Sequence, residues 1–271
     1  QSDPRLIGTH THQVIDLQSV FQPITKFTAN LTYENSISTI HHALRMAQIG
    51  RPGPVHLGIN NRVALQGVSI TESNIIQVQS PKINMDTITS IETILRDNTK
   101  PVIVVGLGLE KDKPYHQVQQ LAEILNAPVI DTPKSKGALP ARHPLFAGTI
   151  GLTRTDPAYE ILDEADYIIA IGFDVVEMVK PWNQLQPLIW IANCENYDPR
   201  IPSEVEFIGE LSSLLDALND ILEIETDETW GRSRIAEFRA KQNSILLPSP
   251  QEACILPQQV LAAIRDNTPD D

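Results

Sequence analysis

The chain has 271 residues, 41% of them hydrophobic, so it can bury a substantial core and hold one large domain or two ordinary ones. Its 21 Lys and Arg against 34 Asp and Glu give a formal net charge of −13. This negative charge repels polyphosphate chains and anionic lipids, which excludes nucleic acid and membrane surfaces as expected partners. No apolar run reaches the ~18 residues that a membrane span needs. Cys194 and Cys254 form no CxxC pair, so we expect a cytoplasmic protein in a reducing compartment.

The first part of the chain is predicted to form a partial α/β domain. Apolar side chains recur at helical spacing over residues 35–49, and Gly50 with Pro52 supplies a stop. Residues 54–59 then form a short apolar segment that is typical of a strand. From about Asn61 to Lys82 the apolar period is lost, which indicates a linker.

The next part alternates helical periods with short β-branched runs. This pattern favours a doubly wound three-layer α/β/α domain with a mostly parallel sheet of about six strands, because strands that are apolar on both sides are covered on both faces. We expect helices at 85–98, 115–127, 158–165 and 210–222, and strands within 100–108, 128–132, 166–172, 187–193 and 204–209. A long connection runs from the second strand to about Phe146. A charged helix at 230–246 then leads away as a connector, and residues 256–267 form a last amphipathic helix.

Two glycine turns follow predicted strands and raise the question of a nucleotide. Gly106 and Gly108 would let the backbone approach a phosphate, but the third glycine of the dinucleotide fingerprint is missing and no helix is expected to begin at once. Gly172 lets the chain leave its strand, and Asp174 could hold a ribose hydroxyl or cap the next segment. These four residues are candidates for a nucleotide site, and tight turns at the edge of the sheet are the alternative.

The histidines offer little support for a metal. His10 and His12 would point to one face of an extended chain, but no third or fourth ligand follows at usable spacing. His41 and His42 are adjacent on a helix and so diverge by about 100°. No GxSxG, CxxC or Walker motif supports nucleophilic hydrolysis or phosphoryl transfer. We predict no metal site in these residues.

Four segments carry a family resemblance. They read GTHTHQVIDLQSVFQPITK (8–26), AQIGRPGPVHLGI (47–59), KPVIVVGLG (100–108) and DYIIAIGFDVVE (166–177), the last followed by KPWN. In this order and at matching separations they resemble the thiamine diphosphate enzymes of the acetolactate synthase group, over nearly the whole chain. THQ, FQPITK and IGFDVVE look most like the catabolic, flavin-free enzymes. The anabolic ones carry Phe-Gln where His12-Gln13 stands and an RFDDR-type string where 173–177 stand.

The resemblance implies a domain order and a pocket. His12 and Gln13 would line the substrate pocket beside the cofactor as catalytic residues, and Lys26 would lie near the same wall. A histidine can donate to a pyruvate carboxylate or move protons, and a glutamine amide both donates and accepts. The implied domains are the end of a pyrimidine-binding domain (1–63), a linker (64–82), a central Rossmann-like domain (83–225), a connector helix and linker (226–255) and the start of a diphosphate-binding domain (256–271).

The same resemblance implies a cofactor that this chain does not hold by itself. The family uses thiamine diphosphate and Mg²⁺, held by a GDG string followed at a distance by Asn, and a glutamate that would lie before Gln1. No GDG string occurs in the sequence. The chain also begins without Met and stops just after an amphipathic stretch. We therefore expect a piece of a longer enzyme, inactive alone, with FAD not required.

The expected activity belongs to the complete enzyme. It would decarboxylate pyruvate and ligate the two-carbon unit to a second 2-keto acid, as an acetolactate synthase-like lyase or transferase that assembles as a homodimer or tetramer. One alternative is another thiamine diphosphate-dependent 2-keto acid decarboxylase or carboligase. A second alternative is a module that binds FAD or ADP, or that is purely architectural.

Overall fold

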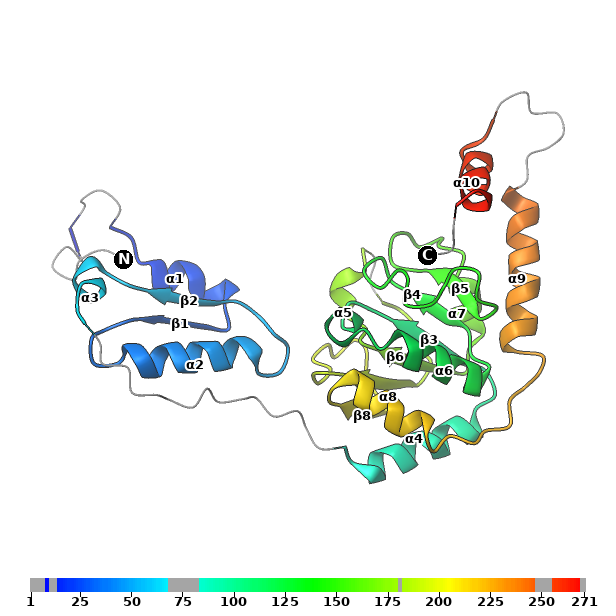
Figure 1. Cartoon of the computed structure of the whole chain (residues 1–271), viewed down its shortest axis with the longest axis horizontal. Coiled ribbons are helices and arrows are strands. Elements are labelled where there is room, and N and C mark those ends of the chain that lie inside the picture. Colours follow the sequence, from blue (N-terminus) through cyan, green and yellow to red (C-terminus); the bar gives the residue numbers. More distant parts are fainter. Residues whose placement is uncertain (1–7, 10–13, 68–82, 180–181, 247–254, 269–271) are drawn as a thin grey trace. The chain divides into compact units, whose positions relative to one another are not determined.

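A computed structural model describes residues 8–9, 14–67, 83–179, 182–246 and 255–268. The chain divides into two compact units, unit 1 (residues 1–80) and unit 2 (residues 81–271) (Figure 1).

Unit 1 is built on two short parallel strands with a helix between them. Its elements are α1 (Leu17–Phe21), η2 (Gln22–Ile24), β1 (Phe27–Asn30), α2 (Ser36–Gln48), β2 (Val55–Gly58) and α3 (Asn61–Ala64). β1 pairs with β2 from Phe27 opposite Val55 to Asn30 opposite Gly58. The sequence predicts α2 and β2 but not β1, because the four residues FTAN show neither an apolar run nor a clear alternation.

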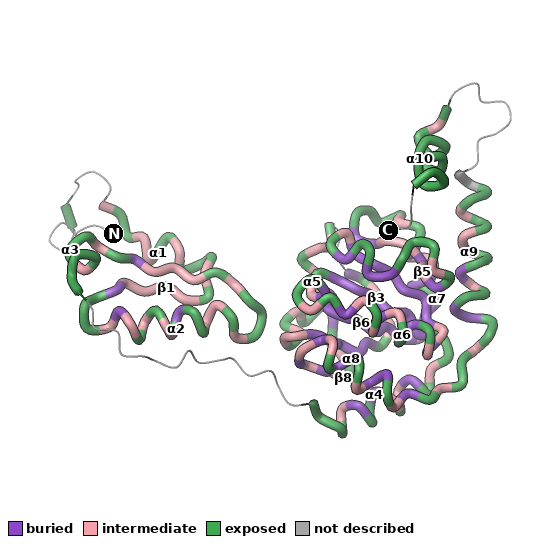
Figure 2. The backbone as a smooth tube through the Cα atoms, viewed as in Figure 1, coloured by how far each residue is buried: buried purple, intermediate pink, exposed green. Residues whose placement is uncertain are grey.

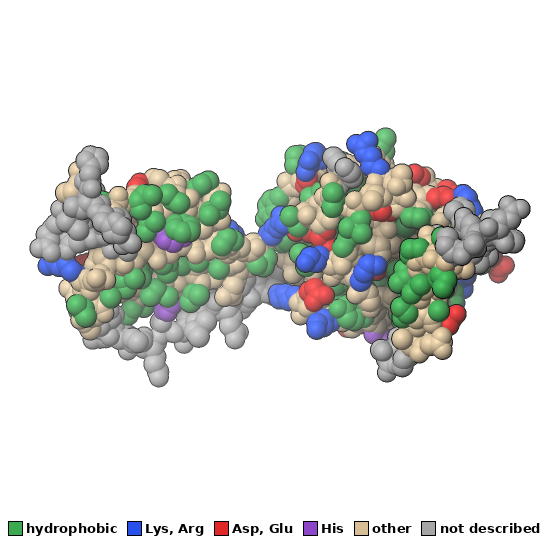
Figure 3. Space-filling model, turned by 90° about the horizontal axis from the view of Figure 1, so that it is seen from above, with side chains coloured by type: hydrophobic (Ala, Val, Ile, Leu, Met, Phe, Trp, Pro, Cys, Tyr) green, Lys and Arg blue, Asp and Glu red, His purple; other side chains and the backbone are tan. Residues whose placement is uncertain are grey.

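The described part of unit 1 buries few side chains. Leu31 and Ala43 are buried, but Leu44 on α2 is 52% exposed and Leu65 is 88% exposed. Figure 2 shows exposed and half-buried backbone over most of this unit. The face seen in Figure 3 carries apolar patches with few charges, whereas charges of both signs are spread over unit 2. Surface of this composition is unusual for a domain that is complete by itself.

Unit 2 contains the expected parallel sheet, which confirms the predicted fold class. Its six strands lie in the order β5-β4-β3-β6-β7-β8, and every pairing is parallel. The strands are β3 (Pro101–Val105), β4 (Val129–Asp131), β5 (Phe146–Thr149), β6 (Tyr167–Ile171), β7 (Leu188–Ala192) and β8 (Val205–Ile208).

Helices cover both faces of this sheet. On one face Ile103, Val105 and Ile169 pack with buried side chains of α4 (Met85–Asp97), α6 (Tyr115–Leu125) and α8 (Leu211–Asn219). On the other face the alternate residues Val102 and Val104 pack with α7 (Tyr159–Glu164) and α9 (Gly231–Leu246). The remaining helices of unit 2 are α5 (Leu109–Asp112), η3 (Val175–Glu177) and α10 (Pro257–Asp266). Successive side chains of one strand point to opposite faces of the sheet and therefore pack into two separate cores.

One strand of this sheet was not identified from the sequence. β5 has only four residues, FAGT, and the sequence pattern predicts that Phe146 ends a long connection. Its pairing with β4 shifts register after Phe146, and Gly148 adopts a φ of +120°. An edge strand with an interior glycine and a bulge lacks the continuous apolar run that marked the central strands.

The connector helix α9 is attached to unit 2 at its first turn. Trp230 is 3% exposed, and its Nε1 donates to the carbonyl oxygen of Pro101 over 2.9 Å. Gly231 adopts a φ of +52°, and a Cβ added there would lie 1.9 Å from the Asn126 carbonyl oxygen. The Oδ1 of Asn126 accepts from the backbone N–H of Arg232 over 3.1 Å. An amide from the end of α6 therefore satisfies one of the free donors at the start of α9.

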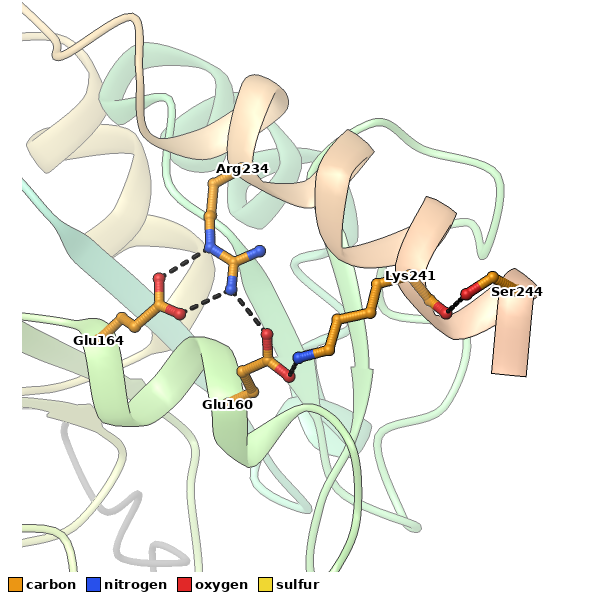
Figure 4. A network of polar contacts seen from close by, with 5 residues as sticks. All are labelled: Glu160, Glu164, Arg234, Lys241 and Ser244. Atoms are coloured by element: carbon orange, nitrogen blue, oxygen red, sulfur yellow. Dashed lines mark hydrogen bonds and ion pairs between the residues drawn. The ribbon is translucent and has the colours of Figure 1, made fainter. Parts of the chain in front are cut away.

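An arginine clamp continues this attachment along α9 (Figure 4). The guanidinium of Arg234 donates to both carboxylate oxygens of Glu164, over 2.7 and 2.6 Å, and to Glu160 over 2.8 Å. The ammonium of Lys241 donates to the other oxygen of Glu160 over 2.7 Å. Arg234 is only 17% exposed whereas Lys241 is 57% exposed. The less exposed guanidinium of Arg234 is therefore a stronger link between α7 and α9 than the exposed ammonium of Lys241.

We predict that Arg234→Met lowers the free energy of unfolding of unit 2 by about 1–2 kcal/mol, because it leaves two carboxylates without their shared cation. Lys241→Met is the matched control and should cost about 0.5 kcal/mol or less, since its ammonium is exposed. Arg234 lowers the pKa of Glu164, so this stability is present at neutral pH and is lost as the pH falls through that lowered value. Urea denaturation of the two variants, at neutral and acid pH, measures both effects, and equal costs for the two substitutions would contradict the clamp.

Candidate functional site

The point where the sheet changes direction lies between β3 and β6. The chain begins unit 2's sheet at β3, moves outward to β4 and β5, and then returns to place β6 on the other side of β3. In open α/β sheets, ligands bind outside the carboxyl ends of the strands at such a switch point. The loops after these two strands carry the four nucleotide-site candidates, Gly106, Gly108, Gly172 and Asp174. The residues predicted from the sequence therefore lie in the loops that follow the two strands at the switch point.

The structure brings the three glycines into direct backbone contact. A Cβ added at Gly106 would lie 2.7 Å from the Cα of Phe173, and one added at Gly108 would lie 2.8 Å from the Cα of Gly172. Gly172 itself adopts a φ of +56°. The backbone N–H of Gly108 donates to the carbonyl oxygen of Gly172 over 2.8 Å. The glycines let the two loops pack on each other, which is the tight-turn role left open by the sequence.

The two loops also contain a short helix and a capping side chain. A one-turn helix, α5, begins at Leu109 directly after Gly108, so the expectation that no helix starts here was wrong. Leu109 is buried and fixes this turn, which ends after four residues at left-handed Lys113. Asp174 accepts from the backbone N–H of Val176 over 3.0 Å and caps η3.

Sequence reasoning missed Glu177, whose carboxylate joins three segments at this edge. Oε1 accepts from the backbone N–H of Leu107 over 2.6 Å. Oε2 accepts from the hydroxyl of Thr132 over 2.6 Å and from the backbone N–H of Lys134 over 3.3 Å. The partners lie 70, 45 and 43 residues away in sequence, so no local pattern could have revealed them.

A buried carboxyl group lies beside this cluster at the end of β4. Asp131 is 2% exposed, and its Oδ1 has no hydrogen-bond partner. Burial raises the pKa of Asp131, and the Thr149 hydroxyl and the Lys136 ammonium offset only part of the rise. The Lys136 ammonium donates to Thr149 Oγ1 over 2.9 Å.

The pocket residues implied for unit 1 are only partly described. His12 and Gln13, like His10, lie outside the described residues. The Lys26 ammonium donates to the carbonyl oxygen of Ile49 and, over 2.9 Å, to that of Arg51. Lys26 therefore holds the loop that follows α2.

Two further histidines of unit 1 make aromatic contacts. The His56 ring stacks on Phe21 with centroids 4.1 Å apart, and the His42 ring meets the edge of Phe27 at 4.8 Å. Among the described residues, no group of three or more His, Cys, Asp and Glu side chains could hold a metal ion. Within the same residues, no helix combines the length and the apolar character that crossing a membrane requires.

We predict that Gly172→Ala destabilises unit 2 by about 3 kcal/mol, from a strained positive φ plus a Cβ placed 2.9 Å from the Leu109 backbone nitrogen. Gly137→Ala is the control, because Gly137 also has a positive φ, +92°, but nothing lies within 4 Å of an added Cβ. It should cost about 1 kcal/mol. Chemical denaturation of the two variants separates loop contact from backbone strain. Equal losses would show that the loops are not packed as described.

We also predict that Asp131→Asn raises the melting temperature at pH 7 and that this gain shrinks as the pH falls. The folded-state pKa of Asp131 is raised, so the folded protein holds this proton more tightly than the unfolded chain does. Stability is therefore lost as the pH rises from the ordinary carboxyl range through the raised value. Thermal melts of wild type and variant across this range provide the measurement. A gain that grows toward acid would contradict the assigned shift.

The comparisons with known proteins agree with this architecture. Residues 88–218 match the family model described as the thiamine pyrophosphate enzyme central domain, where pyrophosphate is a synonym of diphosphate. The chain is 29% identical to a probable acetolactate synthase large subunit of Methanocaldococcus jannaschii, over 96% of this chain and 46% of that protein. It is 26% identical to the acetolactate synthase large subunit of Lactococcus lactis, over 100% of this chain and 48% of that protein.

A third relative is more similar over a shorter stretch. The chain is 32% identical to a probable acetolactate synthase large subunit of Methanococcus aeolicus, over 64% of this chain and 30% of that protein. The chain thus spans about half the length, or less, of these curated relatives. Residues 88–218 are thus similar to the central domain of thiamine diphosphate enzymes, and the chain as a whole is similar to acetolactate synthase large subunits.

Proposed function

We propose that these 271 residues are part of an enzyme that decarboxylates pyruvate and joins the two-carbon unit to a second 2-keto acid, giving a 2-acetolactate-type product. The observation that supports this most is the extent of the similarity. The alignments to acetolactate synthase large subunits cover 96% and 100% of the chain and so include unit 1 as well as the central domain. A match confined to 88–218 would support a shared domain without a shared reaction.

In this proposal unit 1 is the end of a pyrimidine-binding domain and supplies part of the substrate pocket. His12 and Gln13 line it, which the resemblance of residues 8–26 supports. A neutral or protonated imidazole can hold the carboxylate of a 2-keto acid or move a proton, while the glutamine amide fixes its orientation. Lys26 positions the loop that follows α2, because its ammonium donates to the carbonyl groups of Ile49 and Arg51.

The residues at hand do not by themselves fit thiamine diphosphate with Mg²⁺. Mg²⁺ takes near-octahedral oxygen ligands, partly from phosphates and water. The sequence contains no GDG string, and the described residues offer no cluster of ligating side chains. We propose that the cofactor is held by protein sequence other than these 271 residues. The central domain supports that site and needs no FAD.

The proposed setting of the enzyme rests on the same similarity. It acts on a small-molecule 2-keto acid in the cytoplasm and assembles as a homodimer or homotetramer. A second candidate is another thiamine diphosphate-dependent decarboxylase or carboligase. The chain is also 22% identical, over 98% of its length, to a putative thiamine pyrophosphate-containing protein, YdaP, of Bacillus subtilis. A panel of 2-keto acids offered to the complete protein separates the two candidates.

We predict that the complete protein, supplied with thiamine diphosphate and Mg²⁺, releases carbon dioxide from pyruvate and forms acetolactate. His12→Ala should lower turnover roughly tenfold to hundredfold, the range expected when a group that positions substrate or moves a proton is lost. His116→Ala, at an exposed position of α6 in unit 2, is the matched control and should leave turnover unchanged. If the complete protein forms neither carbon dioxide nor acetolactate from pyruvate, the proposed reaction is wrong. Unchanged kinetics of His12→Ala would show that His12 does not line the pocket.

A further inference from the structure

The carboxylate of Glu177 is bound as a ligand anion would be bound. Its three hydrogen bonds all run to other segments: to Leu107 in the loop after β3, and to Thr132 and Lys134 in the loop after β4. All three partners are donors, two of them backbone N–H groups and one a hydroxyl. Donors that converge at the carboxyl edge of a parallel sheet form an anion-binding site.

The short distances indicate that the charge of the carboxylate matters. The contacts with the Leu107 N–H and the Thr132 hydroxyl are both 2.6 Å, and for the hydroxyl this is the length of a hydrogen bond to an ionised carboxylate. The loop after β4 also carries Lys134 and Lys136, whose side chains add positive charge to a chain that is strongly negative overall. A neutral side chain in this place would leave at least one donor without an acceptor.

The position of this anion is also informative. A Cβ added at Gly106 would lie 2.9 Å from the Glu177 Oε1, so the carboxylate lies directly against the first glycine loop. On the other side of that loop, Gly108 touches the backbone of Gly172. These are the loops that border the switch point, where a doubly wound sheet receives the phosphate of a ligand. The Glu177 carboxylate lies beside the first of these loops, and it accepts from that loop and from the loop after β4.

Local capping does not account for this arrangement. The residue that caps η3 is Asp174, three positions earlier, through the backbone N–H of Val176. Glu177 is the last residue of η3, and its three hydrogen bonds all run to residues outside that turn. Its interactions therefore serve the two distant loops.

We propose that the edge of the sheet at β3 and β4 contains an anion site whose resident ligand is the Glu177 carboxylate, which closes the site to carboxylate- or phosphate-bearing ligands. The site is independent of the reaction proposed above. Removal of the side chain opens it to a small external anion, either a carboxylate or a phosphate.

Glu177→Ala and Glu177→Gln in the 271-residue chain test this proposal. Melting is followed by tryptophan fluorescence, because all three tryptophans, Trp182, Trp190 and Trp230, are buried in unit 2. Each protein is melted in sodium chloride and, at matched ionic strength, in acetate, formate or phosphate. The Ala variant should melt lower than wild type in chloride and should recover half or more of that loss, in a saturable way, in acetate or phosphate.

The Gln variant is the control for volume. Its side chain still fills the site but carries no charge, so it should lose stability and should gain no more from any anion than wild type does. Wild type should show only the general salt effect on stability, with no saturable shift in acetate, phosphate, ADP or pyrophosphate. An Ala variant that responds to anions no more than wild type does, or a wild type stabilised by ADP, would overturn the proposal.

A second readout covers an Ala variant that does not fold in chloride. The refolding yield of the denatured variant is then compared in chloride and in acetate. A yield restored by acetate supports the site, and a yield that no anion restores overturns it. Neither readout involves pyruvate, so failure here is distinct from failure of the proposed reaction.

Discussion

The pairing of β3 with β6 is the interaction on which the rest of unit 2 depends. The two strands are hydrogen-bonded along their full length, from Pro101 opposite Tyr167 to Val105 opposite Ile171. Every residue of both strands is buried, with alternate side chains in the two separate cores. If either helical layer detaches, one apolar face of these strands is exposed to water. The helical layers and the strand pairing therefore stabilise each other.

The same pairing fixes the chemistry at the carboxyl edge. Because β3 and β6 end at the same level, their loops meet, and only glycine at 106, 108 and 172 allows backbones to come that close. The Glu177 carboxylate then ties the first loop to the one after β4. The loops at this edge are therefore joined by backbone contact and by one internal carboxylate.

The sequence revealed most of this fold where the signal was local. The apolar runs of β3, β6 and β7 and the helical periods of α2, α4, α6 and α8 were sufficient, because burial on both faces leaves no polar position in such strands. β1 and β5 were missed because four-residue edge strands with a threonine or glycine lack that signal. The glycine turns were identified, but the role of Glu177 depends on partners that only the fold brings near. His12 and Gln13 rest on family resemblance alone.

Amide hydrogen exchange of the whole chain, read residue by residue, tests the central position of β3 and β6 most directly. The account predicts that the amides of 102–105 and 168–171 exchange only through global unfolding of unit 2 and are its slowest group. Edge strand β5 should exchange faster, and β1 and β2 of unit 1 faster still, since few side chains cover them. Two results would contradict this. The amides of β3 and β6 could exchange as fast as those of β5, or the amides of β1 and β2 could be as protected as those of β3 and β6.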